Sequence, residues 1–92
     1  SRSRFCARFK TLVGDTPIGY LTAHRMALAA EQLGAGLLAP ARIAEQAGYE
    51  SEKVFARTFR RWSGLTPSAY LRRERERRKQ VLEIQAREAG EA

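Results

Sequence analysis

The sequence predicts an all-α fold in which one helical unit occurs twice, and three observations support this prediction. Residues 1–25 and 51–75 repeat each other without a gap, fifty residues apart. Each copy has apolar side chains at helical spacing, then a glycine and a Thr-Pro pair, which end one helix and begin the next. No segment alternates apolar and polar residues as a strand does. The identical pairs are Ser1/Ser51, Phe5/Phe55, Phe9/Phe59, Gly14/Gly64, Thr16/Thr66, Pro17/Pro67, Tyr20/Tyr70, Leu21/Leu71 and Arg25/Arg75.

The first copy leads into a long helix. In each copy the serine caps the first helix, the glycine ends it in a left-handed conformation, and the Thr-Pro pair caps and begins the next helix. The first copy therefore predicts helices over residues 1–13 and 17–33, the second of them ended by Gly34 and Gly36. The expected inward positions of the longer helix are Leu21, Met26, Ala29, Ala30 and Leu33.

The second copy is preceded by a short helix. Residues 41–47 predict this helix and residues 51–63 a longer one, with a break at Gly48 between them. The last helix begins at the repeated Thr-Pro pair and continues into an almost wholly charged tail. We expect this tail to be a solvated extension of the helix that frays beyond about Arg87.

The first helix of each copy has one apolar face and one basic face. Helical spacing places three apolar side chains of each copy on a single inward face. Each of these helices also holds four cations, which are Arg2, Arg4, Arg8 and Lys10 in the first copy and Lys53, Arg57, Arg60 and Arg61 in the second. The inward residues are Phe5, Phe9 and Leu12 in the first copy and Phe55, Phe59 and Trp62 in the second.

The composition predicts a polyanionic partner. Seventeen Lys and Arg against ten Asp and Glu give a net charge of +7, which favours association with nucleic acid, although solubility alone also explains such a charge. The single cysteine, Cys6, excludes an internal disulfide and a cysteine-based zinc site. No apolar run is long enough to span a membrane, so we expect a cytoplasmic protein with no membrane partner. The sequence contains no nucleophile–base pair and no metal cluster, so we expect no enzyme, no cofactor and no metal.

The segment from Ile43 into the helix at Ser51 has the arrangement of a helix-turn-helix. Ala44 must be small because the second helix crosses close above it, and Gly48 permits the tight turn between the two helices. The aromatic face of the second helix packs downward, which leaves its basic face free to enter a major groove.

The residues that surround this segment resemble a known family. The stretches Ile43–Tyr49, Ser51–Arg61 and Gly64–Arg72 are similar to the signature of AraC/XylS-type transcriptional regulators. The resemblance covers about residues 1–75. It implies two helix-turn-helix units of the homeodomain-like three-helix type, joined by one long linker helix, in a bacterial regulator that binds double-stranded DNA.

The resemblance also implies a division of the chain. The family has a supporting helix pair before the first recognition helix, so the first unit is expected to be truncated. A separate effector domain is expected outside this fragment. The fragment itself is expected to bind no small molecule. The implied segments are residues 1–15 for the first recognition helix, 16–34 for the linker helix, 40–63 for the second helix-turn-helix, and 66–92 for the C-terminal helix and charged tail.

The candidate DNA-binding residues lie on the basic faces of the two recognition helices. The guanidinium of Arg57 can form a bidentate hydrogen bond with the edge of a guanine, or it can contact phosphate, or it can lie free on the surface. Glu52 can accept from cytosine N4 or serve only as a partner of the helix dipole. Because Ala7 stands where the second copy has Arg57, we expect base reading mainly from the second helix. The candidates are Arg2, Ser3, Cys6, Ala7, Lys10, Ser51, Glu52, Lys53, Arg57, Arg60 and Arg61.

The remaining candidates have simpler expected roles. Arg60, Arg61 and Lys10 are expected to hold phosphates, which positions the protein without specifying sequence. The small side chains of Ser3, Cys6 and Ala7 permit close approach of the backbone to a thymine methyl group.

Two alternatives to a sequence-specific regulator stay open. One is a protein-interaction module whose partner is RNA polymerase or another acidic protein, and the other is a nonspecific architectural DNA binder. A specific reader binds its site about a thousandfold or more tighter than random duplex.

The linker helix is expected to be roughly 25 Å long, shorter than the roughly 34 Å between successive major grooves on one face, which predicts DNA bending.

Overall fold

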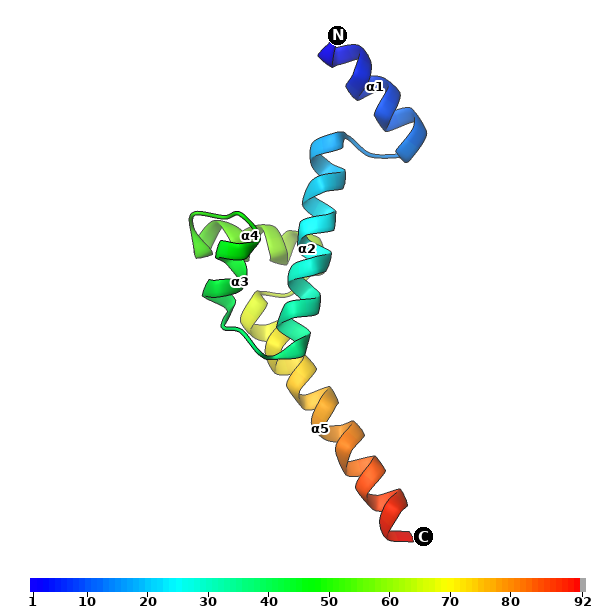
Figure 1. The fold of residues 1–92 in the computed structure, drawn as a ribbon, viewed down its shortest axis with the longest axis vertical. Helices are drawn as coiled ribbons and strands as arrows, with labels where there is room; N and C mark the ends of the chain where they lie inside the picture. Colours follow the sequence, from blue (N-terminus) through cyan, green and yellow to red (C-terminus); the bar gives the residue numbers. More distant parts are fainter. Residues whose placement is uncertain (92) are drawn as a thin grey trace.

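The structure, a computed structural model, describes residues 1–91, and this part of the chain is helical with no strand. Five helices follow one another in an elongated molecule of 65 × 30 × 19 Å, with the termini at opposite ends (Figure 1). The predicted all-α fold is confirmed. The helices are α1 (Arg2–Val13), α2 (Pro17–Ala35), α3 (Pro40–Gln46), α4 (Glu52–Ser63) and α5 (Pro67–Glu91).

The repeated capping residues act in the same way in both copies. The hydroxyl of Ser1 accepts the backbone N–H of Arg4 at 3.3 Å, and that of Ser51 accepts the N–H of Val54 at 3.3 Å. Gly14 and Gly64 both end their helices in the left-handed conformation with φ of 87°, where a Cβ atom would be strained. The predicted helix boundaries at these positions are therefore confirmed.

The hydrophobic core belongs to the second copy and the elements before it. It contains fully buried side chains from α2, α3 and α4, with Tyr70 of α5 packed against its edge. Ala44 is 2% exposed where α4 crosses α3, and Gly48 turns the chain between them with φ of 91°. Both features match the helix-turn-helix interpretation. The core residues are Met26, Ala29, Ala30, Leu33, Ile43, Ala44, Phe55 and Phe59.

Helix α1 buries no residue, so the expected inward face of the first copy is not covered. It touches the rest of the chain through the ring of Phe9, which lies 5.8 Å from that of Tyr20 at the start of α2. Phe5 is 60% exposed and Leu12 is 77% exposed, contrary to the expectation that they face a core. No element among residues 1–91 packs over them, which is the physical reason for their exposure.

Two other expected inward residues are also exposed. Leu21, on the first half of α2, is 47% exposed because α3 and α4 pack farther along this helix. Trp62 is 43% exposed, with only its contact to Phe59, at 5.7 Å between ring centroids, holding it to the core. The inward assignment was wrong for Leu21 and only partly right for Trp62.

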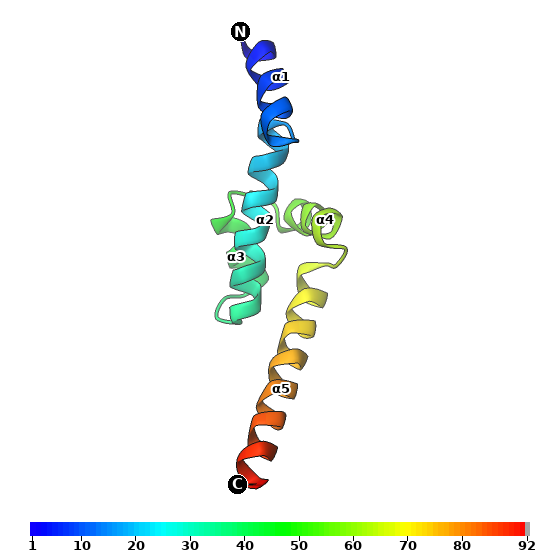
Figure 2. The same ribbon diagram turned by 90° about the vertical axis from the view of Figure 1, so that its right-hand side faces the viewer.

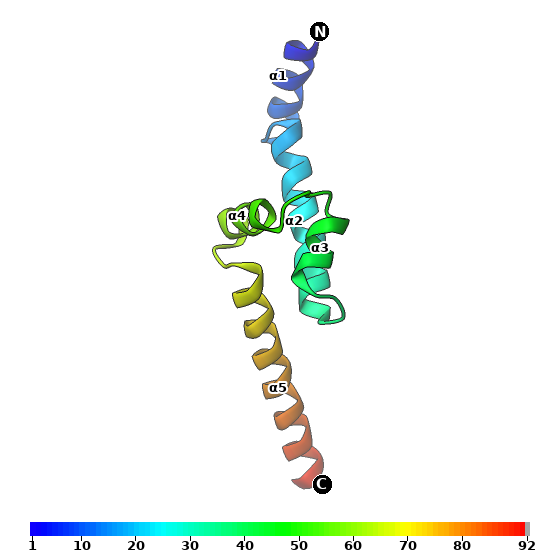
Figure 3. The same cartoon turned by 90° about the vertical axis from the view of Figure 1, so that its left-hand side faces the viewer.

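The ends of α2 and α5 differ from the prediction. Gly34 lies inside α2, and Gly36 ends the helix in the left-handed conformation with φ of 71°. The guanidinium of Arg78 on α5 donates to the carbonyls of Gly34 and Ala35, at 3.3 Å for Ala35. Helix α5 does not fray at Arg87 but continues to Glu91. Figures 2 and 3 show α4 and the start of α5 on one side of α2, with α3 on the other.

Candidate nucleic-acid interface

Helix α4 is sharply divided into a buried face and a basic face. Phe55 and Phe59 are 0% exposed and pack against α2, α3 and Tyr70. At about 100° per residue, Lys53 and Arg57 point within about 20° of the direction opposite Phe55. Both are exposed. Burial of the aromatic side chains therefore fixes the direction in which the cations point.

The basic face of α4 forms one open hollow of about 560 Å³. Its walls hold four cations and no carboxylate, and none of these cations makes an ion pair within residues 1–91. Such an arrangement concentrates positive potential at one exposed place, which attracts a polyanion. The lining residues are Lys53, Ala56, Arg57, Arg60, Arg61 and Thr66.

The dimensions and support of α4 suit a major groove. A helix with its side chains is about 10–12 Å across, and the groove of B-DNA is about 12 Å wide. The N-terminal end of α4 is held by the Ser51 cap and by the turn at Gly48. The ring of Tyr49 also contacts that of Phe55, with centroids 5.6 Å apart. The element that would enter the groove is thus rigidly positioned by its own unit.

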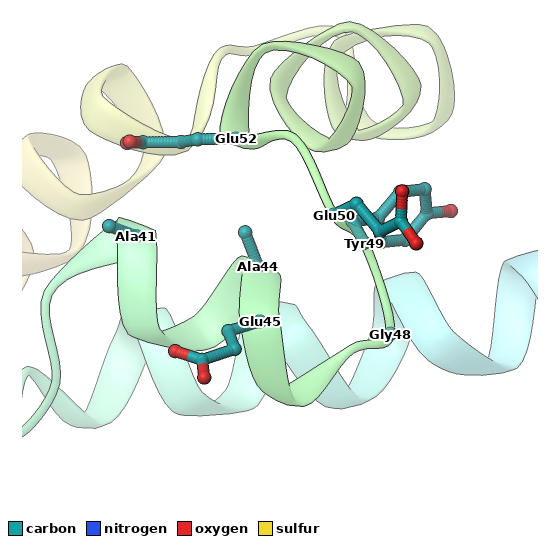
Figure 4. A pocket seen from close by; sticks show the side chains of 7 residues that line it. All are labelled: Ala41, Ala44, Glu45, Gly48, Tyr49, Glu50 and Glu52. Atoms are coloured by element: carbon teal, nitrogen blue, oxygen red, sulfur yellow. The ribbon is translucent and has the colours of Figure 1, made fainter.

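The structure separates Glu52 from the other candidates of α4. Glu52 is only three residues before Phe55, which places it about 60° from the buried face. It lines a different hollow of about 600 Å³, on the side of α3 and the turn, together with Glu45, Glu50 and Tyr49 (Figure 4). The three carboxylates point in different directions there. Glu52 also lies in the first turn of α4, where a negative charge stabilises the helix dipole.

The candidates on α1 form a second exposed face that is separate from the first. Arg2, Ser3, Ala7 and Lys10 are exposed, and Cys6 is partly buried. Ser3, Ala7 and Lys10 share the side of α1 that faces away from Phe5, whereas Arg2 lies only about 60° from Phe5, as Glu52 does from Phe55. The hollow beside α1 is lined by Ser1, Arg4, Phe5 and Arg8, none of which is among these candidates. The structure therefore brings the α4 candidates together and leaves the α1 candidates along a helix surface.

Two residues that line the α4 hollow, Ala56 and Thr66, are not among the DNA-binding candidates from the sequence. Ala56 lies one turn after Lys53 and one turn before Arg60, and its small side chain opens the floor of the hollow. Thr66 caps α5 by accepting the N–H of Ala69 at 3.2 Å, and it borders the hollow at the end of the turn. Helical spacing places Ala56 beside the basic face, and the angle of Glu52 on the helix separates it from Lys53 and Arg57. The position of Thr66 beside the hollow depends on the angle between α4 and α5, and no local sequence pattern predicts that angle.

Two other kinds of site, a cluster of metal ligands and a membrane-spanning helix, are not found in the described part of the chain. Among residues 1–91 no group of three His, Cys, Asp or Glu side chains is placed to hold a metal ion. None of the helices described is both long enough and apolar enough to cross a membrane. The two basic recognition faces are thus the main candidate sites.

The fold and the α4 hollow define a helix-turn-helix protein, and comparisons with known proteins identify its family. A family profile described as a helix-turn-helix domain matches residues 1–73. A protein of Streptomyces lividans described as an AraC-like transcription regulator is 46% identical over 70 residues, which is 76% of this chain and 23% of that protein. The chain belongs to the AraC-type helix-turn-helix family of bacterial transcription regulators.

Named regulators from other bacteria give similar matches. The HTH-type transcriptional regulator AlkR of Acinetobacter baylyi is 39% identical over 76% of this chain and 23% of its own length. The RCS-specific HTH-type transcriptional activator RclR of Escherichia coli is 38% identical over 83% of this chain and 27% of its own length. The chain therefore spans about a quarter of the length of these relatives. No solved structure gives a significant match.

Proposed function

We propose that this chain binds duplex DNA sequence-specifically for transcription regulation, with α4 inserted into a major groove. The observation that carries the proposal is the α4 hollow, in which four cations, none of them in an ion pair within residues 1–91, face away from a buried aromatic face. Membership of the AraC-type family supports it. The proposal assigns the chain no catalytic role, no cofactor and no small-molecule ligand.

The cations of the hollow have two different tasks. Lys53 and Arg57 lie in the first half of α4, the part of a recognition helix that meets base edges. Arg57 reads guanine through O6 and N7, which a bidentate guanidinium matches in geometry. Arg60 and Arg61 lie in the last turn, where they hold phosphates and fix the register of the protein on the duplex.

The proposal gives α1 a subordinate part in a second groove. Helix α2, with 19 residues, is about 28 Å long. Successive major grooves on one face of B-DNA are about 34 Å apart, so simultaneous entry of α1 and α4 bends the duplex. Circular-permutation gel shifts test this step: mobility that varies with the position of the site supports bending, and constant mobility rejects it.

The experiment that tests the proposal is selection from a random duplex library at fixed salt. The wild-type chain is compared with Arg57→Ala and Lys53→Ala, and with Arg42→Ala as a control on α3. We expect a defined site that is lost or relaxed in the two α4 variants, by about 1–3 kcal/mol for each lost base contact. An unselective pool from every variant, with binding that falls evenly with salt, would reduce the function to nonspecific backbone binding.

The same variants separate DNA binding from an interaction with RNA polymerase. A polymerase contact outside the α4 hollow would survive Arg57→Ala, whereas binding to the selected duplex would not. Pull-down of purified polymerase with wild type and Arg57→Ala, in the absence of DNA, makes this distinction.

A further inference from the structure

The basic segment at the start of α5 contains two kinds of cation. Arg73 and Arg77 pair with the half-buried Glu74 at 3.6 and 3.4 Å, and the guanidinium of Arg73 also lies 5.0 Å from the Tyr70 ring centroid. Arg78 holds the last carbonyls of α2. Arg73 and Arg77 are therefore engaged in contacts within α5, and Arg78 holds α5 to the end of α2.

The other three cations of this segment are Arg72, Arg75 and Lys79. All are exposed, and within residues 1–91 none makes an ion pair or a side-chain hydrogen bond. Their spacing of three and four residues places them in one row along the helix. At about 100° per residue they lie within about 40° of the direction opposite Tyr70, the residue that faces the core. We name Arg72, Arg75 and Lys79 the α5 row.

The α5 row continues the basic surface of α4. Thr66, which lines the α4 hollow, caps α5. Ser68 follows on the same side of the helix as the row. In Figures 2 and 3 the start of α5 lies directly beside α4, on the side of α2 away from α3. A polyanion seated on α4 therefore meets the row where it extends past the hollow.

We propose that the α5 row binds the phosphate backbone of the duplex held by α4, beyond the base pairs that α4 reads. The proposal rests on the proposed function. Arg72 and Lys79 are about 10 Å apart along the helix axis, which corresponds to about three successive phosphates of one strand. The row adds affinity without sequence preference, because phosphates carry no base information.

The composition of the row favours phosphate over an acidic protein partner. Protein interfaces depend on buried aromatic or large apolar anchors. Between Arg72 and Lys79 the exposed neighbours on this side are Ser68 and Glu76, which offer no such anchor, and the exposed Leu82 follows only beyond Lys79. Two of the three large apolar residues of the tail, Val81 and Ile84, lie on the opposite side of α5. Glu76 borders the row and moderates its charge.

The test is a salt titration of binding to a random-sequence duplex of about 30 base pairs, which needs no knowledge of the operator. Arg72→Gln/Arg75→Gln is compared with Arg42→Gln/Arg87→Gln, a control that removes the same charge from α3 and from a position off the row. Glutamine keeps a helix propensity close to that of arginine. We expect the slope of log K against log salt to fall in magnitude by about 1.8 for the row variant, about 0.9 for each lost phosphate contact. The control variant retains the wild-type slope.

A gain-of-charge variant and a trimmed duplex sharpen the test. Glu76→Lys should tighten binding and steepen the salt slope. On the duplex selected by the wild-type chain, removing the base pairs that flank the α4 site should abolish the difference in salt slope between the row variant and the control. A difference that persists on the trimmed duplex would overturn the proposal.

The outcomes separate this proposal from the function on which it rests. If Lys53→Gln/Arg57→Gln weakens binding while the row variant behaves like the control, the row does not touch DNA and the proposed function stands. If the wild-type chain does not bind duplex at all, both fail. Unchanged DNA binding with reduced transcript from a regulated promoter would overturn the proposal in favour of an acidic protein partner. Far-ultraviolet circular dichroism verifies that each variant stays helical.

Discussion

The two copies of the repeat have the same local structure and opposite surroundings. Phe55 of the second copy is 0% exposed, whereas its partner Phe5 is 60% exposed. The serine caps have the same length and the glycine stops the same φ in both copies. Capping and helix formation are therefore encoded within each copy, but burial requires another element to pack against it. In the second copy α2 and α3 supply that element.

The first prediction concerns the two equivalent phenylalanines. Phe55→Ala removes a fully buried ring, so we expect it to lower the free energy of unfolding by about 3–5 kcal/mol. Phe5→Ala removes a ring that is already mostly in water, and we expect a loss below about 1 kcal/mol. Urea denaturation followed by circular dichroism measures both. Similar losses in the two variants would contradict the asymmetry between the copies.

The second prediction concerns the two serine caps. Ser51→Ala leaves the N–H of Val54 without its hydroxyl partner, and we expect it to lower the free energy of unfolding by about 1 kcal/mol. Ser1→Ala removes the matching bond at Arg4, but α1 buries nothing, so only the helicity of α1 should fall. The same denaturation series measures the loss of unfolding free energy in both variants. Equal losses would show that α1 unfolds together with the core and would contradict the prediction.

The third prediction transfers a side chain between equivalent positions. Ala7→Arg gives α1 the arginine that α4 has at Arg57. If α1 reaches the duplex, the salt slope should increase in magnitude by about 0.9, the contribution of one added phosphate contact. The control is Ala27→Arg, which adds the same charge on α2. An equal change in the control would show that only net charge matters.

Local signals allowed the sequence to predict most of the helices. Serine, glycine and Thr-Pro positions act within a few residues, so the bounds of α1 and α4 could be derived from them. The C-terminal end of α2 is in a tertiary contact that the sequence does not predict. Arg78 binds the last carbonyls of α2, and α5 is held alongside it. A contact across more than forty residues leaves no pattern in a local window.

The candidate site was predictable to a similar degree. Helical spacing from Phe55 identifies Lys53 and Arg57 as residues of one exposed face, and the structure places them in one hollow. Glu52 was grouped with them by its position in sequence, but its angle on the helix places it in the acidic hollow near Tyr49. The roles of all candidate residues at DNA stay predictions.

The most direct test of the central claim, that α4 is the principal DNA reader, is amide chemical-shift mapping. The ¹⁵N-labelled chain is titrated with the duplex that the wild-type chain selects. We predict the largest changes at the amides of α4 and at the turn around Thr66, with smaller changes along α1. Larger changes on α1 than on α4, or changes centred on the acidic hollow beside Tyr49, would contradict the account.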